Sequence, residues 1–531
     1  MPPNLPPVAI RNSRLTGALP LLLAVLAAYF FAVRVRHGIW FVGFVDESEH
    51  LLGGKMLNAG AVLYRTFVTQ HGPVTFMLTQ AYGAIFGWRH ANGARLISAA
   101  LALDAAACVA TTPALPDRVA RLWAAALFLG LTASVWLLQG LYLVNYHAIA
   151  GFLLVAALAL CVVPAWRGAA VDRGRAFAAG ACAMLVIATA YSFGPAIVLL
   201  GASTIWALGM GPSRASRLAV IAGAAAGALG VLAWLLIFGD VTGYLAFHFA
   251  ENQFFFIHFM EFTFDSFLRT SVPSLQPRAL VQAIALICWL VSFCLLLAMN
   301  MVGSSRQLIG PILLGCAGVL TQSARGGIFF QNGSFLIGSI GVLSMALPAA
   351  IMRCLRVCSP IGLAVGSLLV GLCIVGAELA GRHAVTSPVR ITRAQMADVP
   401  HSNLGRSPDA ESARIRALVR PDERMLVVPY APGVYMAADR SPMDRYFYYL
   451  PWDAAYAKAP WFGQTHDLCV DLPKAPPRLI YFDDWKVWGH YYMHDYMPCF
   501  VTILNAQYRR QADFPNLYLR IDHVLGDTPS P

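Results

Sequence analysis

The chain has 531 residues, of which 58% are hydrophobic and 12% charged, with a formal net charge of +11. Soluble domains are nearer roughly 45–50% apolar, so the composition excludes an ordinary soluble globular protein and predicts an integral membrane protein. The positive charge fits membrane topology and anionic lipid headgroups, and no nucleic-acid-binding motif accompanies it.

Apolar runs long enough to cross a bilayer as helices recur along most of the chain. They predict about eleven transmembrane helices, since each span needs roughly 20 apolar residues. Their expected positions are 15–33, 92–110, 120–138, 147–164, 176–192, 195–210, 218–238, 279–299, 307–323, 333–351 and 360–380. A Gly194-Pro195 break separates the fifth run from the sixth, so these two are alternatively one interrupted segment.

The arginines between these runs fall in alternate loops, which fixes the expected orientation. Because cytoplasmic loops carry an excess of Lys and Arg, the arginine-bearing loops are predicted to be cytoplasmic. The residues concerned are Arg11, Arg14, Arg118, Arg121, Arg167, Arg173, Arg175, Arg214, Arg217, Arg306, Arg353 and Arg356. The first outer loop (35–91), the second outer loop (239–278) and the C-terminal region then face the opposite, extracytoplasmic side.

The first outer loop is expected to contain two short helices. Asp46 and Glu49 are spaced as in a capping box, which predicts a helix start, and Gly60 fits its C-terminal end. Gly72-Pro73 predicts the start of a second helix running toward Gly87. Both segments are too polar on one face to span the bilayer, so we expect them to lie along the membrane interface.

Asp46 and Glu47 are the leading catalytic candidates. Charges are costly to place at a bilayer edge, so two adjacent carboxylates just after the first span indicate a functional site. Asp46 fits a general base that removes a proton from an acceptor nucleophile. Glu47 is either a second catalytic carboxylate or a partner of the first. The alternative for Asp46 is a purely structural helix cap, which is compatible with an ionised base.

Cationic and hydrogen-bonding side chains follow on the same outer face and predict a phosphate-binding set. Arginine matches phosphate oxygens with two parallel donors, whereas lysine and protonated histidine act as point charges. The candidates are Lys55, Tyr64, Arg65, His71 and, in the outer loop after the ninth span, Arg325. The positive-inside rule disfavours an arginine at that last position, and a bound anion would explain it. The alternative for the first four is simple snorkelling at the interface, and the alternative for Arg325 is an isolated outer-loop arginine without a ligand.

The chain divides into a membrane region (1–380), a proline-containing linker (381–410) and a polar C-terminal region (411–531). Alternation of short apolar runs with helical patterns predicts a small extracytoplasmic α/β domain. Its expected elements are a helix at 409–419, strands at 424–429 and 478–482, a helix at 499–511 and a strand at 516–521. Cys469 and Cys499 either form a disulfide there or remain free thiols.

Metal binding has weak support in the sequence. His490 and His494 have metal-like spacing but no third ligand nearby, so an aromatic-rich surface is the preferred interpretation. The sequence identifies no metal site and no cofactor, and it leaves a divalent metal open.

The segment from Asp46 to about residue 100 resembles the start of the GT-C superfamily of glycosyltransferases, which includes lipid-A aminoarabinose transferases and protein O-mannosyltransferases. The matching motifs are Asp46-Glu47, Ala59-Gly60, Tyr64-Arg65-Thr66, His71-Gly72-Pro73, Gly87 and Arg95-Leu96. Thr66 stands where the family often has Asp, and His71 stands where Lys is commoner. The second difference puts a lysine–phosphate contact in doubt.

This resemblance implies a mainly α GT-C-like fold in a bacterial inner membrane, with a periplasmic C-terminal domain. It implies inverting transfer of a sugar from a polyprenyl-phosphate donor to a glycan, lipid or protein acceptor. Asp46 would be the base, and His71 and Arg325 would contact the phosphate. The requirements of the reaction agree, because a lipid-phosphate leaving group needs cations rather than a general acid.

The main rival is a multi-pass transporter or flippase of lipid-linked glycans. Proton-coupled transporters place ionisable residues near the membrane midplane, and here only Asp104 and Glu378 lie in or near spans. A membrane-anchored receptor would leave the Asp46 cluster unexplained. The sequence does not identify the sugar, the acceptor or the oligomeric state.

Overall fold

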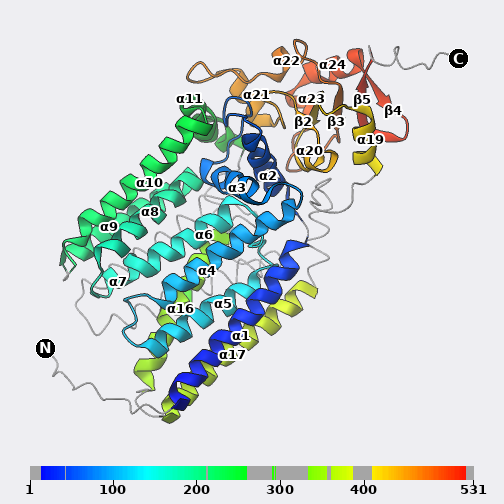
Figure 1. The fold of residues 1–531 in the computed structure, drawn as a ribbon. Helices are drawn as coiled ribbons and strands as arrows, with labels where there is room; N and C mark the ends of the chain where they lie inside the picture. Colours follow the sequence, from blue (N-terminus) through cyan, green and yellow to red (C-terminus); the bar gives the residue numbers. More distant parts are fainter. Residues whose placement is uncertain are drawn as a thin grey trace.

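The structure is a computed structural model that describes residues 14–41, 43–210, 213–259, 290–291, 294, 333–355, 360–386 and 410–521. A long bundle of helices carries a sheet-containing domain at one end, and α2 and α3 lie between the two (Figure 1). The bundle helices are α1 (Arg14–Ile39), α4 (Leu96–Ala110), α5 (Arg118–Val135), α6 (Tyr146–Ala157), η2 (Leu158–Val162), α7 (Val163–Trp166), α8 (Arg173–Thr189), η3 (Tyr191–Phe193), α9 (Gly194–Met210), α10 (Ser216–Phe238), α16 (Gly333–Cys354) and α17 (Pro360–Thr386).

Eight helical segments of the described residues are long and apolar enough to cross a membrane, so this is a multi-pass membrane protein. They coincide with eight of the predicted spans. The predicted span at 176–192 corresponds to α8, a helix of 17 residues, and those at 279–299 and 307–323 lie almost wholly outside the described residues. The break before Pro195 is the short η3 turn, so α8 and α9 are separate helices.

The bundle is packed closely where small residues meet. Gly180 of α8 faces α10 so tightly that a β-carbon would lie 2.0 Å from the carbonyl oxygen of Val220. Gly223 of α10 has the reciprocal fit, 1.9 Å from the carbonyl oxygen of Phe177. Glycine therefore lets these two backbones touch, which is a common way for helices to associate within a bilayer.

A buried ion pair joins the first and last described spans. Arg34 of α1 donates to Glu378 of α17 at 2.7 Å, and Arg382, one turn further along α17, donates to the same carboxylate oxygen at 3.1 Å. Burial of a charge is tolerated when it is paired in this way. Glu378 is thus a structural contact between α1 and α17.

The first outer loop contains α2 (Val45–Asn58), α3 (Pro73–Phe86) and the short η1 (Ala91–Arg95). The predicted start of α3 at Gly72-Pro73 is confirmed, and Gly87 ends the helix with a φ of 71°. The expected capping box is wrong: the N-cap of α2 is Phe44, and no side chain caps it. Both carboxylates of the supposed box are used elsewhere.

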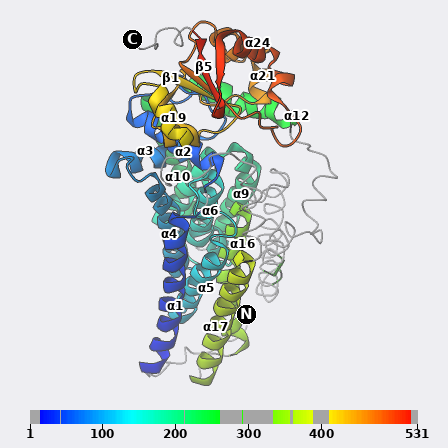
Figure 2. The same cartoon turned by 90° about the vertical axis from the view of Figure 1, so that its right-hand side faces the viewer.

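Helix α2 is also covered by protein, contrary to the expectation that it lies along the membrane interface. Ten of its residues are buried, and it lies between the bundle and the C-terminal domain (Figures 1 and 2). The polar face of α2 therefore turns inward, against other polar side chains.

The C-terminal region forms a five-stranded sheet with strand order β2-β1-β3-β5-β4. Strands β1 and β2 are parallel, as are β1 and β3, whereas β5 runs antiparallel to both β3 and β4. The strands are β1 (Arg424–Val428), β2 (Ser441–Pro442), β3 (Leu479–Phe482), β4 (Tyr508–Gln511) and β5 (Phe514–Arg520). The helices are α19 (Ala410–Leu418), α20 (Gly433–Ala438), α21 (Pro451–Ala457), α22 (Leu468–Asp471), α23 (Met493–Tyr496) and α24 (Pro498–Gln507). Cys469 and Cys499 are joined by a disulfide.

Aromatic side chains attach this domain to the segment that follows α10, which comprises α11 (Val241–Gly243), the π-helix η4 (Tyr244–Phe256) and α12 (Ile257–Phe259). Phe254 stacks on Trp461 with ring centres 4.5 Å apart, and Phe256 meets Trp452 edge-on at 4.8 Å. Such pairs contribute beyond their buried area. The C-terminal domain is therefore fixed against the outer loops.

Candidate active site

Helix α2 presents two carboxylates on one face. Residues three positions apart are neighbours on a helix, so Asp46 and Glu49 point in similar directions, whereas Glu47 is turned about 100° from Asp46. The structure brings both Asp46 and Glu49 against tyrosines of the C-terminal domain. The site thus lies where the membrane bundle and the sheet domain meet.

Asp46 is half-buried, and one of its carboxylate oxygens, Oδ1, lies 3.0 Å from the phenol oxygen of Tyr430. Burial raises the pKa of Asp46 to about 6, and the charge on Glu49 adds to this, while His71 and the Tyr430 hydrogen bond oppose it. Its other oxygen has no protein hydrogen bond among the described residues. A carboxylate with a pKa near neutrality and one oxygen available suits general base chemistry.

Glu49 is fully buried and accepts hydrogen bonds at both oxygens. Its Oε2 accepts from Tyr430 at 2.6 Å, and its Oε1 accepts from Tyr448 at 3.2 Å, from Thr69 and from His71 Nδ1 at 2.9 Å. Burial alone would raise its pKa, but His71, the hydrogen bonds and His50 outweigh burial and hold the pKa at about 2. Glu49 is therefore a permanent anion beside Asp46.

Tyr430 bridges the two carboxylates through one phenol group. A phenol has one hydrogen to donate, and the shorter contact, 2.6 Å, is to Glu49, whereas Asp46 is at 3.0 Å. When Asp46 carries a proton, its hydroxyl can donate to the phenol oxygen while the phenol donates to Glu49. The three groups then form a continuous hydrogen-bonded chain that accommodates a proton on Asp46.

His71 is held by its backbone and its ring. The phenol of Tyr64 donates to the carbonyl oxygen of His71 at 2.6 Å. The next residue, Gly72, packs so closely on the end of α8 that a β-carbon would lie 2.4 Å from the carbonyl oxygens of Ala188 and Thr189. The turn is therefore rigid, and it directs the His71 ring to Glu49.

His50 follows Asp46 by four residues, about one helical turn, on α2 and is completely buried. Its Nδ1 lies 3.2 Å from the carbonyl oxygen of Val144, and its ring meets that of His71 edge-on at 4.9 Å. Burial and the neighbouring His71 lower its pKa to about 3, although Glu49 opposes them. His50 is thus a neutral member of the cluster that the sequence did not single out.

Glu47 turns away from this cluster and forms a two-pronged ion pair with Arg95. Arg95 Nε donates to Glu47 Oε1 at 2.9 Å, and Nη2 donates to Oε2 at 2.6 Å. The Val144 amide also donates to Glu47, and Arg95 Nη1 donates to the carbonyl oxygens of Gly38 and Phe41. Both side chains are buried, so the pair anchors α2 to the end of α1 and the start of α4.

The remaining predicted phosphate contacts are scattered. Lys55 pairs with Asp439 of the C-terminal domain, and nine residues after Asp46 it lies on the opposite side of α2. Arg65 is exposed on the loop, whereas Tyr64 is buried with a φ of 65°. Arg325 lies outside the described residues. Of the five, the structure brings His71 to the carboxylates directly and Tyr64 through the His71 backbone.

A second acid pair lies close by. Glu251 of η4 and Asp453 of α21 are both buried. Burial and the neighbouring Asp453 raise the pKa of Glu251 well above its usual value, and burial raises the pKa of Asp453 to about 7. The charge on Glu49 also raises the pKa of Asp453. The site therefore has a second pair of acids with raised pKa values beside Asp46 and Glu49. The sequence motifs did not indicate this second pair.

The residues present do not form a metal site in the described parts of the chain. No group of three or more His, Cys, Asp or Glu side chains there is placed to hold an ion. Glu49, the nearest second carboxylate to Asp46, already accepts from four protein donors. The described residues provide a base and a hydrogen-bonded anion, and a divalent metal is left open.

Comparisons with known proteins define the fold. The chain is similar to ArnT from Cupriavidus metallidurans bound to undecaprenyl phosphate, with 16% identity, a TM-score of 0.50 and coverage of 80% of this chain and 85% of that one. It is also similar to the oligosaccharyltransferase AglB from Archaeoglobus fulgidus in complex with an inhibitory peptide and a dolichol-phosphate, with 14% identity, a TM-score of 0.50 and coverage of 88% and 69%. No protein-family profile matches the chain, and no curated protein does.

Both neighbours are GT-C glycosyltransferases. The protein described here therefore has a GT-C-like fold: a mainly helical multi-pass membrane region with a small C-terminal α/β region. At such low identity the likeness defines the fold, and the chemistry must be argued from the residues of this chain.

Proposed function

We propose that this protein is an inverting glycosyltransferase that moves a sugar from a polyprenyl-phosphate donor to an acceptor hydroxyl. The observation that carries the proposal is Asp46: a carboxylate with a pKa of about 6, one oxygen available, at the outer end of a GT-C-like bundle. The structural neighbours were solved with undecaprenyl phosphate and dolichol-phosphate, which supports a donor of this class.

The reaction needs one base and one stabilised leaving group. Asp46 takes the proton from the acceptor hydroxyl as its oxygen bonds to the anomeric carbon of the sugar. The bond from that carbon to the phosphate oxygen breaks on the opposite face, and its electron pair stays with the lipid phosphate. The proton on Asp46 then donates to Tyr430, which Glu49 holds in place.

The other predicted residues receive different roles in this proposal. His71 contacts the departing phosphate, because its ring is oriented by Glu49 at 2.9 Å beside the base. Glu47 acts through Arg95 as a positioning residue that fixes the direction of α2. Lys55 and Arg65 lie away from Asp46, and Arg325 remains a candidate phosphate contact.

The proposed location is a bacterial inner membrane with the C-terminal domain in the periplasm. The arginine pattern of the loops supports this orientation, and the Cys469–Cys499 disulfide is typical of an oxidising compartment. The transporter alternative receives no such support. Glu378, its candidate acid near a span end, is paired with Arg34 and Arg382.

Transfer from a defined donor tests the function directly. The purified protein in lipid nanodiscs is mixed with radiolabelled polyprenyl-phosphate sugars and a cell-envelope fraction. We expect the radiolabelled sugar to become covalently attached to an acceptor in the envelope fraction. One polyprenyl phosphate should be released for each sugar transferred. Stable retention of the label on the lipid, with movement of that lipid between leaflets instead, would overturn the proposal and favour a flippase.

The pH dependence of transfer should report Asp46. Because the base must be ionised, kcat/KM should fall about tenfold for each pH unit below the Asp46 pKa of about 6. When Asp46 is ionised, Tyr430 shares its one hydrogen between Glu49 and Asp46, and this contact lowers the pKa of Asp46. Tyr430→Phe removes the contact, so the acid limb should move to higher pH. Tyr448→Phe, which removes a contact to Glu49 but none to Asp46, is the matched control. A limb that stays fixed or moves down in Tyr430→Phe would contradict the assignment.

A further inference from the structure

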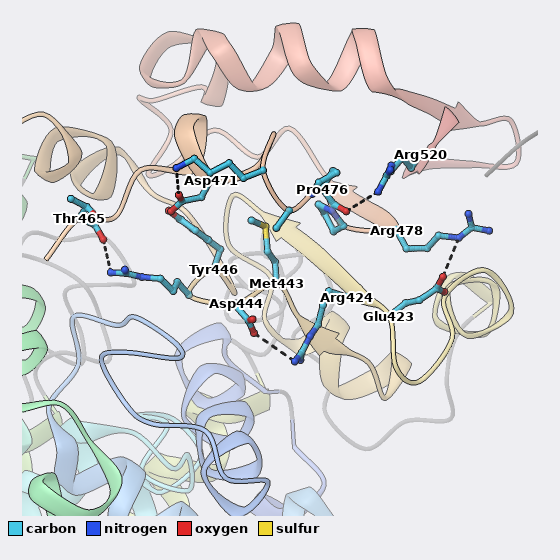
Figure 3. A pocket seen from close by; sticks show the side chains of 14 residues that line it. Glu423, Arg424, Met443, Asp444, Tyr446, Thr465, Asp471, Pro476, Arg478 and Arg520 are labelled. Carbon is cyan, nitrogen blue, oxygen red and sulfur yellow. Dashed lines mark hydrogen bonds and ion pairs between the residues drawn. The ribbon is translucent and has the colours of Figure 1, made fainter. Parts of the chain in front are cut away.

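The C-terminal domain contains a cationic cavity that the proposed reaction does not use. It has a volume of about 580 Å³, within the range of small-molecule sites, roughly 300–1,000 Å³. Its charged lining consists of five cationic side chains and three acidic ones: Arg424, Arg445, Lys474, Arg478, Arg520, Glu423, Asp444 and Asp471. The charged groups labelled in Figure 3 come from the start of β1, the segment after β2, the end of α22, the residue before β3 and the end of β5.

The acidic side chains of the cavity are already engaged. Asp444 pairs with Arg424 at 3.6 Å, and Glu423 pairs with Arg478 at 4.0 Å. Asp471 accepts from the phenol of Tyr446 at 2.6 Å (Figure 3). The carboxylates therefore fix the positions of neighbouring groups, and the cavity as a whole keeps an excess of positive charge.

Arg445 is a cation of the cavity whose protein contacts are incomplete. It has a φ of 69°, a backbone conformation that costs energy for a residue with a side chain. One terminal nitrogen donates to the carbonyl oxygen of Thr465, but its Nε is buried without a hydrogen-bond partner among the described residues. A buried N–H of a charged group normally has an acceptor. The charge of Arg445 is therefore only partly compensated by the protein, and an anion in the cavity that it lines would pair with it.

The same segment connects the cavity to the catalytic carboxylates. The amide of Arg445 donates to the carbonyl oxygen of Thr66 at 2.7 Å, and Phe447 packs edge-on against Phe67 at 5.6 Å. Tyr448 then donates to Glu49. Three residues span at most about 11 Å, so the cavity wall and the active site lie within the reach of one short oligosaccharide.

We propose that this cavity binds an anionic saccharide, the phosphate- or carboxylate-bearing part of the acceptor. This rests on the proposed glycosyltransferase function. The cavity is built wholly from the C-terminal domain, beyond the ends of the bundle helices (Figures 1 and 3), so the donor's lipid tail, which stays in the bilayer, is the wrong occupant. Arginine is suited to carboxylate and phosphate groups, and the engaged carboxylates and main-chain carbonyls suit sugar hydroxyls.

Calorimetric titration of the full-length protein without any donor tests the cavity alone. Glucose 6-phosphate and glucuronate are the anionic probes, and glucose and inorganic phosphate are the comparisons. We expect one or both anionic sugars to bind and to bind more tightly than either comparison. Equal binding of inorganic phosphate would make this a free-anion site, and equal binding of glucose would remove the role of charge; either result overturns the proposal.

Substitutions test which arginines of the cavity bind the anionic sugar. Arg445→Gln and Arg424→Gln should each weaken binding of the anionic sugar about tenfold, the usual consequence of losing a charge-assisted contact. Arg424 is half-exposed, so we expect its variant to fold normally. Arg509→Gln removes an exposed arginine of β4 outside the cavity and should leave binding unchanged. Equal weakening by all three variants would overturn the site.

Saccharide binding at the cavity can be tested independently of sugar transfer. Because no donor is present, an Asp46→Asn protein should bind the anionic sugar as well as the unmodified protein. Loss of transfer with retained binding would sink the catalytic assignment alone, and absence of binding in an active enzyme would sink the cavity assignment alone.

Discussion

Replacing Asp46 by asparagine should lower sugar transfer by about 10²- to 10⁴-fold, the usual contribution of a positioned general base. Asparagine keeps the shape of the side chain and can still bond to Tyr430, but it cannot take a proton. Steady-state transfer from a labelled polyprenyl-phosphate sugar measures the effect. The loss should appear mainly in kcat, since the donor's phosphate and lipid contacts are unchanged.

The control for this variant is Asp422→Asn, which removes a carboxylate that is largely exposed on the C-terminal domain. It should retain full activity. Thermal unfolding of both variants in the same detergent should match that of the unmodified protein. An Asp46→Asn protein that folds normally and keeps full activity would show that another group accepts the proton.

Breaking the Glu47–Arg95 pair should have the largest effect on stability. Arg95→Met leaves the Glu47 carboxylate buried without its partner, which typically costs about 3–5 kcal/mol. It also removes the donor to the carbonyl oxygens of Gly38 and Phe41. We expect low yield and a clearly lowered unfolding midpoint for the purified protein.

The double variant Glu47→Met/Arg95→Met distinguishes the pair from either residue alone. With both charges removed, part of the lost stability should return, because replacing a buried ion pair with apolar side chains is often tolerated. Recovery should be incomplete, since the freed backbone groups keep no partner. A double variant less stable than the sum of the two single variants would contradict the interpretation of the pair as a mutual contact.

The membrane region could be largely predicted from the sequence because its signal is local. A bilayer demands long apolar helices, so composition alone locates the spans in the described residues. The Gly72-Pro73 turn was equally readable, since proline favours the first position of a helix. The same turn holds His71, whose contact with Glu49 is not visible in the local sequence.

The candidate site was predictable only in part, because its contacts cross hundreds of residues. Glu49 meets Tyr430 and Tyr448 across sequence separations of 381 and 399, and nothing local to those tyrosines indicates an active site. Spacing alone suggested that Asp46 and Glu49 cap their helix. The same spacing places both carboxylates on one face of α2. In the structure this face contacts Tyr430 and Tyr448 of the C-terminal domain.

Adjacency in the sequence was a misleading guide for Asp46 and Glu47. Asp46 and Glu47 form a conspicuous pair in the sequence, which suggested a shared role. On a helix they diverge by about 100°, so one reaches the tyrosines and the other reaches Arg95. Glu47 and Glu49 are chemically alike, and only tertiary contacts tell them apart.

The dependence of Glu49 on two tyrosines late in the sequence sets an order for the assembly of this site. Residues 45–58 leave the ribosome long before Tyr430 and Tyr448, and the C-terminal domain must be made before it can dock on them. Until then the acidic helix lacks its phenol partners, so nascent or truncated chains should be catalytically silent. Under the proposed function, docking of the C-terminal domain is therefore the step that completes the active site.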